Sequence, residues 1–464
     1  MSLSKDSKIS LGTANIKKLL IEYSVPAIIG MMATSLYNVI DSIFIGHGVG
    51  ALAISGLAIA FPLMNLAAAF GTLVGVGGAT LVSIKMGQQD TEEASNILGN
   101  VVVLSVIIGI IFMLVGLIFI DEILFFFRAS HNTISYTKDF MKIILYGTVI
   151  THLYFGLNNV MRSSGYPRKA MYITLLSVLI NIILAAIFIF WFNWGIKGAA
   201  IATILAQAIA LSWTLTHFFQ QKSFIHFQSH IFRLKVRIVK GIFSVGLAPF
   251  MLNACACFIV ILINQSLYEH GGDLAIGAYG IINRLVMLIV MIVMGFTQGM
   301  QPIAGYNFGA QQYGRVLSVL KLTIIYASSV TITGFIIGEL FPYHLAMLFT
   351  SDATLIELSA FGMRIVMSAF PFIGFQIVVS NFFQSIGKAH KAIFISSTRQ
   401  LLFLLPLLLI LPRHSGVLGV WISMPLSDLI SFFAAGFFLY YELASTPNFL
   451  KMRMKNHTAI SFLI

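Results

Sequence analysis

Charged residues are too few in this chain to cover a surface that faces water. Lys, Arg, Asp and Glu make up 9% of the sequence, whereas hydrophobic residues make up 58%. A soluble domain carries about 25% charged residues. Long apolar runs alternate here with short polar segments, and a helix needs roughly 20 apolar residues to cross a bilayer. We therefore expect an all-α membrane protein that spans the lipid bilayer many times.

The apolar runs predict twelve transmembrane helices. Their approximate ranges are 17–46, 53–83, 94–120, 138–163, 169–192, 196–219, 237–266, 274–304, 316–342, 356–386, 391–411 and 416–441. With the N-terminus inside, twenty of the 28 Lys and Arg lie at the inner side, five at the outer side and three within spans. The positive-inside rule then places both termini in the cytoplasm. This bias explains the net charge of +12 without a nucleic-acid partner. The polar, basic start predicts no cleaved signal peptide.

Two halves of the chain follow the same design. Residues 220–241 form the longest inner polar segment, with six predicted spans before it and six after it. The halves match at an offset of about 222 residues, and the matching pairs include Gly77/Gly299, Gln89/Gln311, Gly165/Gly387 and Lys169/Lys391. An even number of spans makes the repeats parallel. We predict an N-lobe at 1–219, a cytoplasmic linker at 220–241 and a C-lobe with a cytoplasmic tail at 242–464. Transporters with this design bind substrate between the repeats.

Several motifs occur in order and, in part, twice. They include "YSVPAIIGMMATSLYNVIDSIFIG", "GVGGATLVSIKMGQQD", "NNVMRSSGYPRKAMYITLLSVLIN", "GMQPIAGYNFGAQQY" and "NFFQSIGKAHKA". On these residues the chain resembles the multidrug and toxic compound extrusion (MATE) family over nearly its whole length. The resemblance implies two lobes around a central cleft and an ion-driven exporter of cationic or amphipathic drugs. We expect a monomer in the bacterial cytoplasmic membrane.

Asp41 is the one carboxylate between Glu22 and Asp90. Because ionisable residues inside a membrane are costly, they are functional by default. Tyr37 and Asn38, four and three residues earlier, share its helix face. Asn181 and Thr203 are expected at a similar depth on the fifth and sixth helices. Such polar groups suit a proton or cation site, and the alternative is a buried Asp with a structural role.

The resemblance sharpens this interpretation. The family's N-lobe cation site matches Asp41, Asn181, Ala199 and Thr203. The family's usual second Asp is replaced here by Ala185. Sodium prefers several hard oxygen ligands, so this replacement favours proton coupling, with sodium coupling as the alternative. Pro26 should kink the first helix, and the matching proline is where the family's helix is thought to bend.

The C-lobe contains other charges within its predicted spans. Arg399 and Asp428 lie at overlapping depth on successive helices, which predicts a structural ion pair, with drug binding or gating as the alternative. The drug path should be lined by aromatic, Met and amide side chains. The candidates are Met64, Asn65, Asn158, Tyr279, Asn283 and Gln301.

Other functions are disfavoured by the residues within the spans. A lipid-oligosaccharide flippase of the wider superfamily usually needs a strongly cationic cavity, whereas only Arg284, Arg364 and Arg399 fall within spans. An intramembrane enzyme would need paired carboxylates, a metal cluster or a Ser/His arrangement, and we find none. A channel is a further alternative, but the duplicated halves favour a transporter that works by alternating access. We expect no metal site and no cofactor other than the coupling ion.

Overall fold

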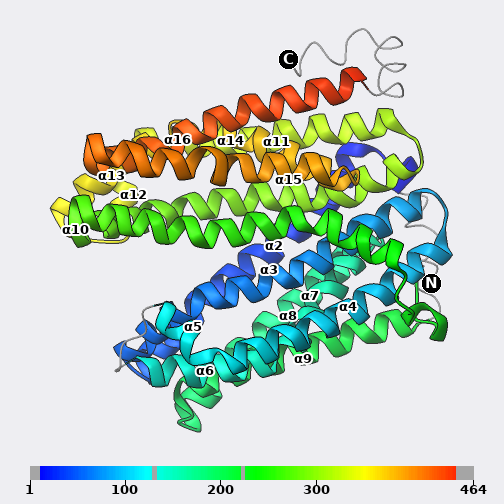
Figure 1. The fold of residues 1–464 in the computed structure, drawn as a ribbon, viewed down its shortest axis with the longest axis horizontal. Helices are drawn as coiled ribbons and strands as arrows, with labels where there is room; N and C mark the ends of the chain where they lie inside the picture. Colours follow the sequence, from blue (N-terminus) through cyan, green and yellow to red (C-terminus); the bar gives the residue numbers. More distant parts are fainter. Residues whose placement is uncertain (1–10, 128–132, 221–224, 446–464) are drawn as a thin grey trace. The chain divides into compact units, whose positions relative to one another are not determined.

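The computed structural model describes residues 11–127, 133–220 and 225–445 (Figure 1). All regular secondary structure within these ranges is helical. The first half of the chain contains the helices α2 (Ile16–Gly48), α3 (Ala51–Gly87), α4 (Thr91–Ile118), α5 (Ile120–Phe126), α6 (Ile134–Tyr146), α7 (Thr148–Ser163), α8 (Pro167–Ala186), η1 (Ile187–Trp191) and α9 (Gly195–Phe219).

The second half begins with a short 3-10 turn and continues with helices of 6 to 74 residues. These elements are η2 (Ser229–Phe232), α10 (Val236–Gly309), α11 (Tyr313–Leu340), α12 (Pro342–Met347), α13 (Ala353–Met367), α14 (Phe370–Ser385), α15 (Ala389–Ser397), η3 (Thr398–Leu404) and α16 (Leu405–Ser445). Both η1 and η3 are π-helical segments that continue directly from α8 and α15.

The described helices account for the twelve predicted spans. Eight helices are long and apolar enough to cross a membrane, and the bent pairs α6/α7 (54°) and α13/α14 (52°) bring this number to ten. Two of these ten contain a break, at Gly272 in α10 and at Gly416 in α16, where the backbone leaves the helical region. Dividing them there gives twelve, so the predicted all-α fold with twelve transmembrane helices is confirmed.

The repeat is visible in the backbone as well as in the sequence. Residues with positive φ recur at matching places in the two halves. The pairs are Gly50 and Gly272, Gln89 (61°) and Gln311 (59°), Gly165 and Gly387, and Gly195 and Gly416 (both 56°). Gly165 and Gly387 reach φ values of 102° and 75°, which a residue with a Cβ rarely adopts. The same turns therefore join corresponding helices in both halves.

Packing divides the chain into two compact units. Among the described residues, unit 1 contains residues 11–13 and 29–253, and unit 2 contains residues 14–28 and 254–445. Helices α2 and α10 each contribute to both units, whereas the sequence prediction assigned each of them to one lobe. In unit 1, α7 packs against α3, α4 and α9, and in unit 2, α14 packs against α11 and α16. The predicted lobe boundaries and the central cleft stay predictions.

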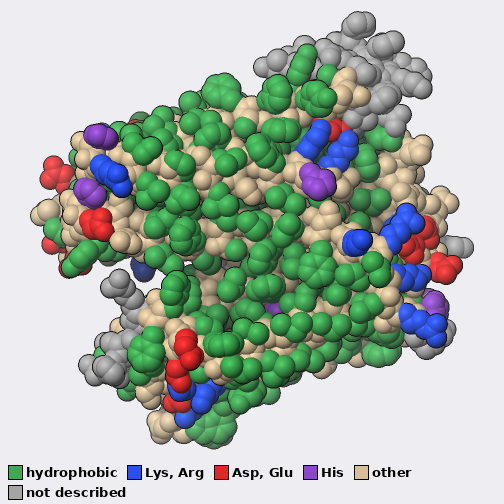
Figure 2. Space-filling view, in the orientation of Figure 1, with side chains coloured by type: hydrophobic (Ala, Val, Ile, Leu, Met, Phe, Trp, Pro, Cys, Tyr) green, Lys and Arg blue, Asp and Glu red, His purple; other side chains and the backbone are tan. Residues whose placement is uncertain are grey.

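Apolar side chains cover much of the outer surface. Figure 2 shows hydrophobic side chains over most of the visible face, with charged side chains gathered mainly near helix ends. Exposed examples include Ile111 (56%), Leu179 (56%) and Phe437 (65%). A water-facing protein rarely exposes contiguous apolar area of this extent. This surface suits contact with lipid.

Candidate functional site

Asp41 lies on α2 within unit 1 and is 7% exposed. Ile45, one turn later, belongs to an apolar core that also contains Leu63, Phe140 and Phe188. Tyr37, one turn earlier, is half-buried. The Tyr37 side chain hydrogen-bonds Thr203 and is close enough to Asp41 for an electrostatic interaction. One turn of α2 thus brings a carboxylate and a phenol close together, and the phenol reaches Thr203 on α9.

Asn181 and Thr203 join α8 to α9 at this place. The Nδ2 atom of Asn181 donates to Oγ1 of Thr203 at 3.0 Å. The Thr203 hydroxyl donates in turn to the backbone carbonyl of Ala199 at 3.1 Å. Ala199 is fully buried, and its small side chain lets the helices approach closely. The structure therefore connects Asn181, Ala199 and Thr203 through hydrogen bonds, and connects Thr203 to Asp41 through Tyr37.

Two acceptor oxygens in this cluster are buried without a donor. Neither Oδ1 of Asp41 nor Oδ1 of Asn181 makes a hydrogen bond with the described part of the chain. Leaving a buried acceptor unsatisfied costs about 1–3 kcal/mol, and more when the group is charged. A proton on the carboxylate, or a cation bound to either oxygen, would remove part of this cost. The geometry therefore suits a group that changes its charge during function.

Three further residues named in the sequence prediction lie on the same helices, α8 and α2. Ala185 is fully buried in the same apolar core as Ile45 and Ala199, so no second carboxylate is supplied from this turn of α8. Asn38 is exposed, which places its side chain outside the buried cluster. Pro26 is buried inside α2, which continues through it as one helix.

An ion pair lies in the interior of unit 2. Nε of Arg399, in η3, donates to Oδ1 of Asp428, in α16, at 2.5 Å. Asp428 is 4% exposed at its side chain, whereas Arg399 is 27% exposed. Tyr279 on α10 is buried and interacts electrostatically with Arg399. The two charges that the sequence placed at overlapping depth are in direct contact.

The other drug-path candidates lie in different surroundings. In unit 1, Asn158 is buried and donates to the carbonyl of Ala170 at 3.2 Å, so its amide fastens α7 to α8. Met64 is half-buried against the apolar core of the same unit. The remaining candidates are half-buried, namely Asn65, Asn283 and Gln301.

The sequence did not predict the burial of two ionisable residues. Glu442, near the end of α16, is 1% exposed and pairs with Lys388 and with Lys391 (2.6 Å). His152 on α7 is also 1% exposed, and its Nε2 lies 2.9 Å from the carbonyl of Ala67 on α3. Glu442 is separated from its lysines by about fifty residues, so no local sequence pattern predicts these ion pairs. For His152, its position inside an apolar helix was the available signal.

Comparison with known proteins decides the family. The MatE family model matches residues 26–187 and again residues 249–410, once in each half of the chain. The chain belongs to the MATE family. Members of this family are transporters, which confirms the prediction that this MATE protein is not an enzyme. The double match also agrees with the repeat seen in the sequence and in the backbone.

Individual relatives support the same assignment. The multidrug export protein MepA of Staphylococcus haemolyticus (strain JCSC1435) is 27% identical over 92% of this chain and 94% of its own length. A solved structure of the MATE multidrug transporter DinF-BH is 36% identical, with a TM-score of 0.87 over 93% of this chain and 97% of that one. An outward-facing MATE family transporter is 22% identical, with a TM-score of 0.89 over 94% and 98%. This chain is accordingly a multi-pass MATE multidrug efflux transporter.

Proposed function

We propose that this MATE transporter is a proton-driven antiporter that exports cationic or amphipathic compounds by alternating access. In this proposal it works as a monomer in a bacterial cytoplasmic membrane, with both termini in the cytoplasm. The relatives named MepA and DinF-BH support a drug substrate, since their names describe multidrug transport. The 28 Lys and Arg, concentrated at one predicted side, support the orientation.

The observation that carries the proposal is the buried Asp41 carboxylate with a donor-free Oδ1. Burial favours the neutral acid, because an isolated charge is costly away from water. Tyr37 lies close to Asp41 and hydrogen-bonds Thr203, which also accepts from Asn181, so a chain of polar groups begins beside the carboxylate. These opposing effects suit a group that gains a proton on one side of the membrane and loses it on the other.

A proton suits the role of coupling ion better than sodium because residue 185 is an alanine. A sodium ion is best held by several hard oxygens, preferably anionic ones. A carboxylate one turn after Asn181 would provide a second anionic group, but this position carries a methyl group inside an apolar core. A proton needs one carboxylate only.

Coupling to drug movement follows from the position of Asp41 on α2. From the outward-open state the outer solution reaches Asp41, and protonation removes its charge. The attraction between α2 and the polar groups of α8 and α9 then weakens. Pro26 cannot donate the usual helical hydrogen bond, so α2 bends most easily there. The rearranged lobe holds the drug less well and releases it outward.

Replacement of Asp41 by Asn tests this function. Asp41→Asn keeps the size and the neutral charge of the protonated acid but cannot exchange a proton. In proteoliposomes, drug efflux driven by an imposed pH gradient should fall at least ~10-fold, and efflux should lose its pH dependence. Asp121→Asn, at a half-exposed carboxylate paired with Lys138, is the matched control and should transport normally. Wild-type rates and pH dependence in Asp41→Asn would overturn the proposal.

A further inference from the structure

The segment that joins α9 to α10 lies at a membrane boundary. Helix α9 ends at Phe219 and α10 begins at Val236, and both belong to membrane-spanning helices. Whatever joins them must therefore start and finish at the same surface of the bilayer. The structure describes this segment from Ile225 onward, including the short turn η2. Drug binding and ion coupling, as proposed above, do not use it.

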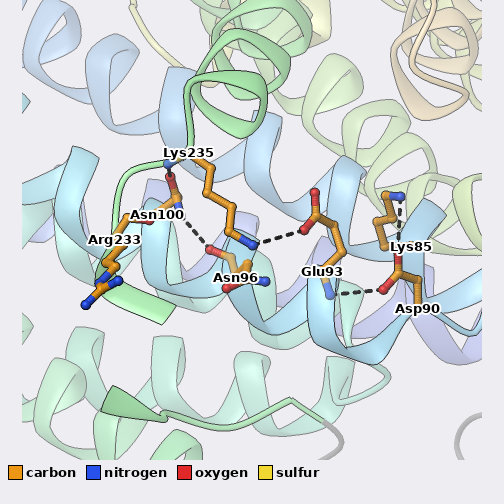
Figure 3. A network of polar contacts seen from close by, with 7 residues as sticks. All are labelled: Lys85, Asp90, Glu93, Asn96, Asn100, Arg233 and Lys235. Carbon is orange, nitrogen blue, oxygen red and sulfur yellow. Dashed lines mark hydrogen bonds and ion pairs between the residues drawn. The ribbon is translucent and has the colours of Figure 1, made fainter. Parts of the chain in front are cut away.

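Asn100 on α4 holds the backbone of this segment in place. Its Oδ1 accepts the backbone N–H of Lys235 at 3.0 Å, and its Nδ2 donates to the carbonyl of Arg233 at 3.1 Å. Gly99 allows the close approach, because a Cβ there would lie 2.2 Å from the carbonyl oxygen of Ile231. Ile231 itself is fully buried. The segment is thus anchored to unit 1 through its backbone, which leaves the following side chains available (Figure 3).

Six consecutive side chains of this anchored segment are exposed, and they alternate between apolar and basic. Residues 232–237 read Phe-Arg-Leu-Lys-Val-Arg, and all six are exposed. The apolar members Phe232, Leu234 and Val236 are 39%, 46% and 70% exposed. Apolar side chains beside cations are typical of segments that lie in the interface of a bilayer. The positive-inside rule explains the cations but not the three exposed apolar side chains between them.

The nearby acids leave two of these cations uncompensated. Glu93 lies 3.6 Å from Nζ of Lys235, and Asp90 pairs with Lys85 at 3.2 Å. The Arg233 side chain extends away from Glu93 in Figure 3. Within the described ranges no ion pair is found for Arg233 or for Arg237. Two guanidinium groups therefore remain for an anion from outside the chain.

We propose that residues 232–237 form a binding site for anionic phospholipid headgroups. Arg233 and Arg237 bind the phosphate groups, since a guanidinium matches phosphate oxygens with paired N–H donors. Phe232, Leu234 and Val236 enter the boundary between headgroups and acyl chains. An acidic protein or a nucleic acid would satisfy the cations but would leave these apolar side chains in water. Lipid binding here stabilises the linker on α4, and with it the connection between the two halves of the chain.

Lipid titration tests the charge requirement. The full-length protein in detergent is titrated with phosphatidylglycerol or phosphatidylcholine while its thermal unfolding is followed. Phosphatidylglycerol should stabilise the wild type more than phosphatidylcholine does. In Arg233→Gln/Arg237→Gln the phosphatidylglycerol concentration that gives half of this stabilisation should rise about 25-fold, because each cation contributes about fivefold. Lys142→Gln/Arg413→Gln removes the same charge elsewhere and should titrate like the wild type.

Spin labels test the position of the apolar side chains by an independent route. In a Cys255→Ala/Cys257→Ala background, Phe232→Cys or Leu234→Cys carries the label in vesicles that contain phosphatidylglycerol. Relaxation by oxygen should exceed relaxation by a water-soluble nickel complex at both positions. Gln88→Cys, at an exposed turn residue, should show the opposite order. Preferential contact with the nickel complex at 232 and 234, or identical lipid titrations for the double Arg variant and the wild type, would overturn the proposal.

Discussion

At the scale of single residues, the proposal of proton coupling rather than sodium coupling depends on Ala185. Its methyl group packs among apolar residues of α2, α6 and α9, one turn from Asn181. Asp41 therefore stands as a single carboxylate beside neutral polar groups. A site of this kind gains a proton without recruiting further ligands, whereas a sodium ion would gain from a second anionic oxygen.

Introduction of a carboxylate at this position should create sodium sensitivity. Ala185→Asp places an unpaired charge in an apolar core, which should cost about 3–5 kcal/mol of stability in sodium-free buffer. Sodium should then restore part of the loss by joining the new carboxylate to Asp41, and should raise the unfolding temperature relative to potassium. Ala185→Asn, with similar size and no charge, should show no difference between the two salts. Equal sodium responses in both variants would contradict the idea.

At the scale of helices, the contact between Arg399 and Asp428 fastens η3 to α16. Asp428→Ala leaves a guanidinium without its partner inside unit 2 and should cost about 3–5 kcal/mol. Arg399→Asp/Asp428→Arg should recover part of this loss. Asp139→Asn breaks an exposed pair with Lys197 and should cost less than about 1 kcal/mol. Thermal unfolding in detergent measures each change. Unchanged stability of Asp428→Ala with impaired transport would assign the pair to the substrate instead.

The start of α4 provides a prediction about pH. Asp90 is the N-cap of α4 and accepts the backbone N–H of Glu93 at 3.0 Å. This hydrogen bond lowers the pKa of Asp90 below its ordinary value of 3.8, with a smaller contribution from Lys85. Because the pKa of Asp90 is lower in the folded protein, its ionised carboxylate stabilises the fold at pH values above the ordinary pKa. This stabilisation is lost as the pH falls through the lowered pKa.

Removal of this cap should therefore destabilise the protein at neutral pH but not at acidic pH. Asp90→Ala should cost about 1 kcal/mol at pH 7. The difference from wild type should shrink as the pH falls below about 4, where the wild-type carboxyl gains its proton. Thermal unfolding between about pH 3 and pH 7 measures the difference, and Glu92→Ala, next in the same turn, is the control. A difference that stays constant over this range would rule out a role for the charge.

At the scale of the whole molecule, the charge bias predicts the orientation of the chain. Twenty basic residues at one side against five at the other predict that the segment that contains η2 is cytoplasmic. In a Cys255→Ala/Cys257→Ala background, His230→Cys on this exposed segment should resist an impermeant thiol reagent in intact cells. It should react after the cells are permeabilised. Reaction in intact cells would reverse the proposed topology.

The sequence alone determined the membrane class, the twelve helices, the repeat and the presence of a carboxylate, Asp41, within a span. These features depend on local composition, because a long apolar run has one stable outcome in a bilayer and a carboxylate within it is costly. The offset of about 222 residues reappears as matched positive-φ turns, since the same residues make the same turns. The placement of Asn181 near Thr203 was also accessible, because depth along a helix can be counted from the span boundaries.

Only the tertiary structure decided which side chains meet across helices. It joined Glu442 to Lys388 and Lys391, placed Asn38 outside the buried cluster, and anchored the linker to Asn100 more than 130 residues away. These outcomes depend on how each helix is rotated about its axis. A helix that is apolar on all sides carries no periodic signal for that rotation. Packing sets it instead, through close approaches such as that of Gly99 to the Ile231 carbonyl.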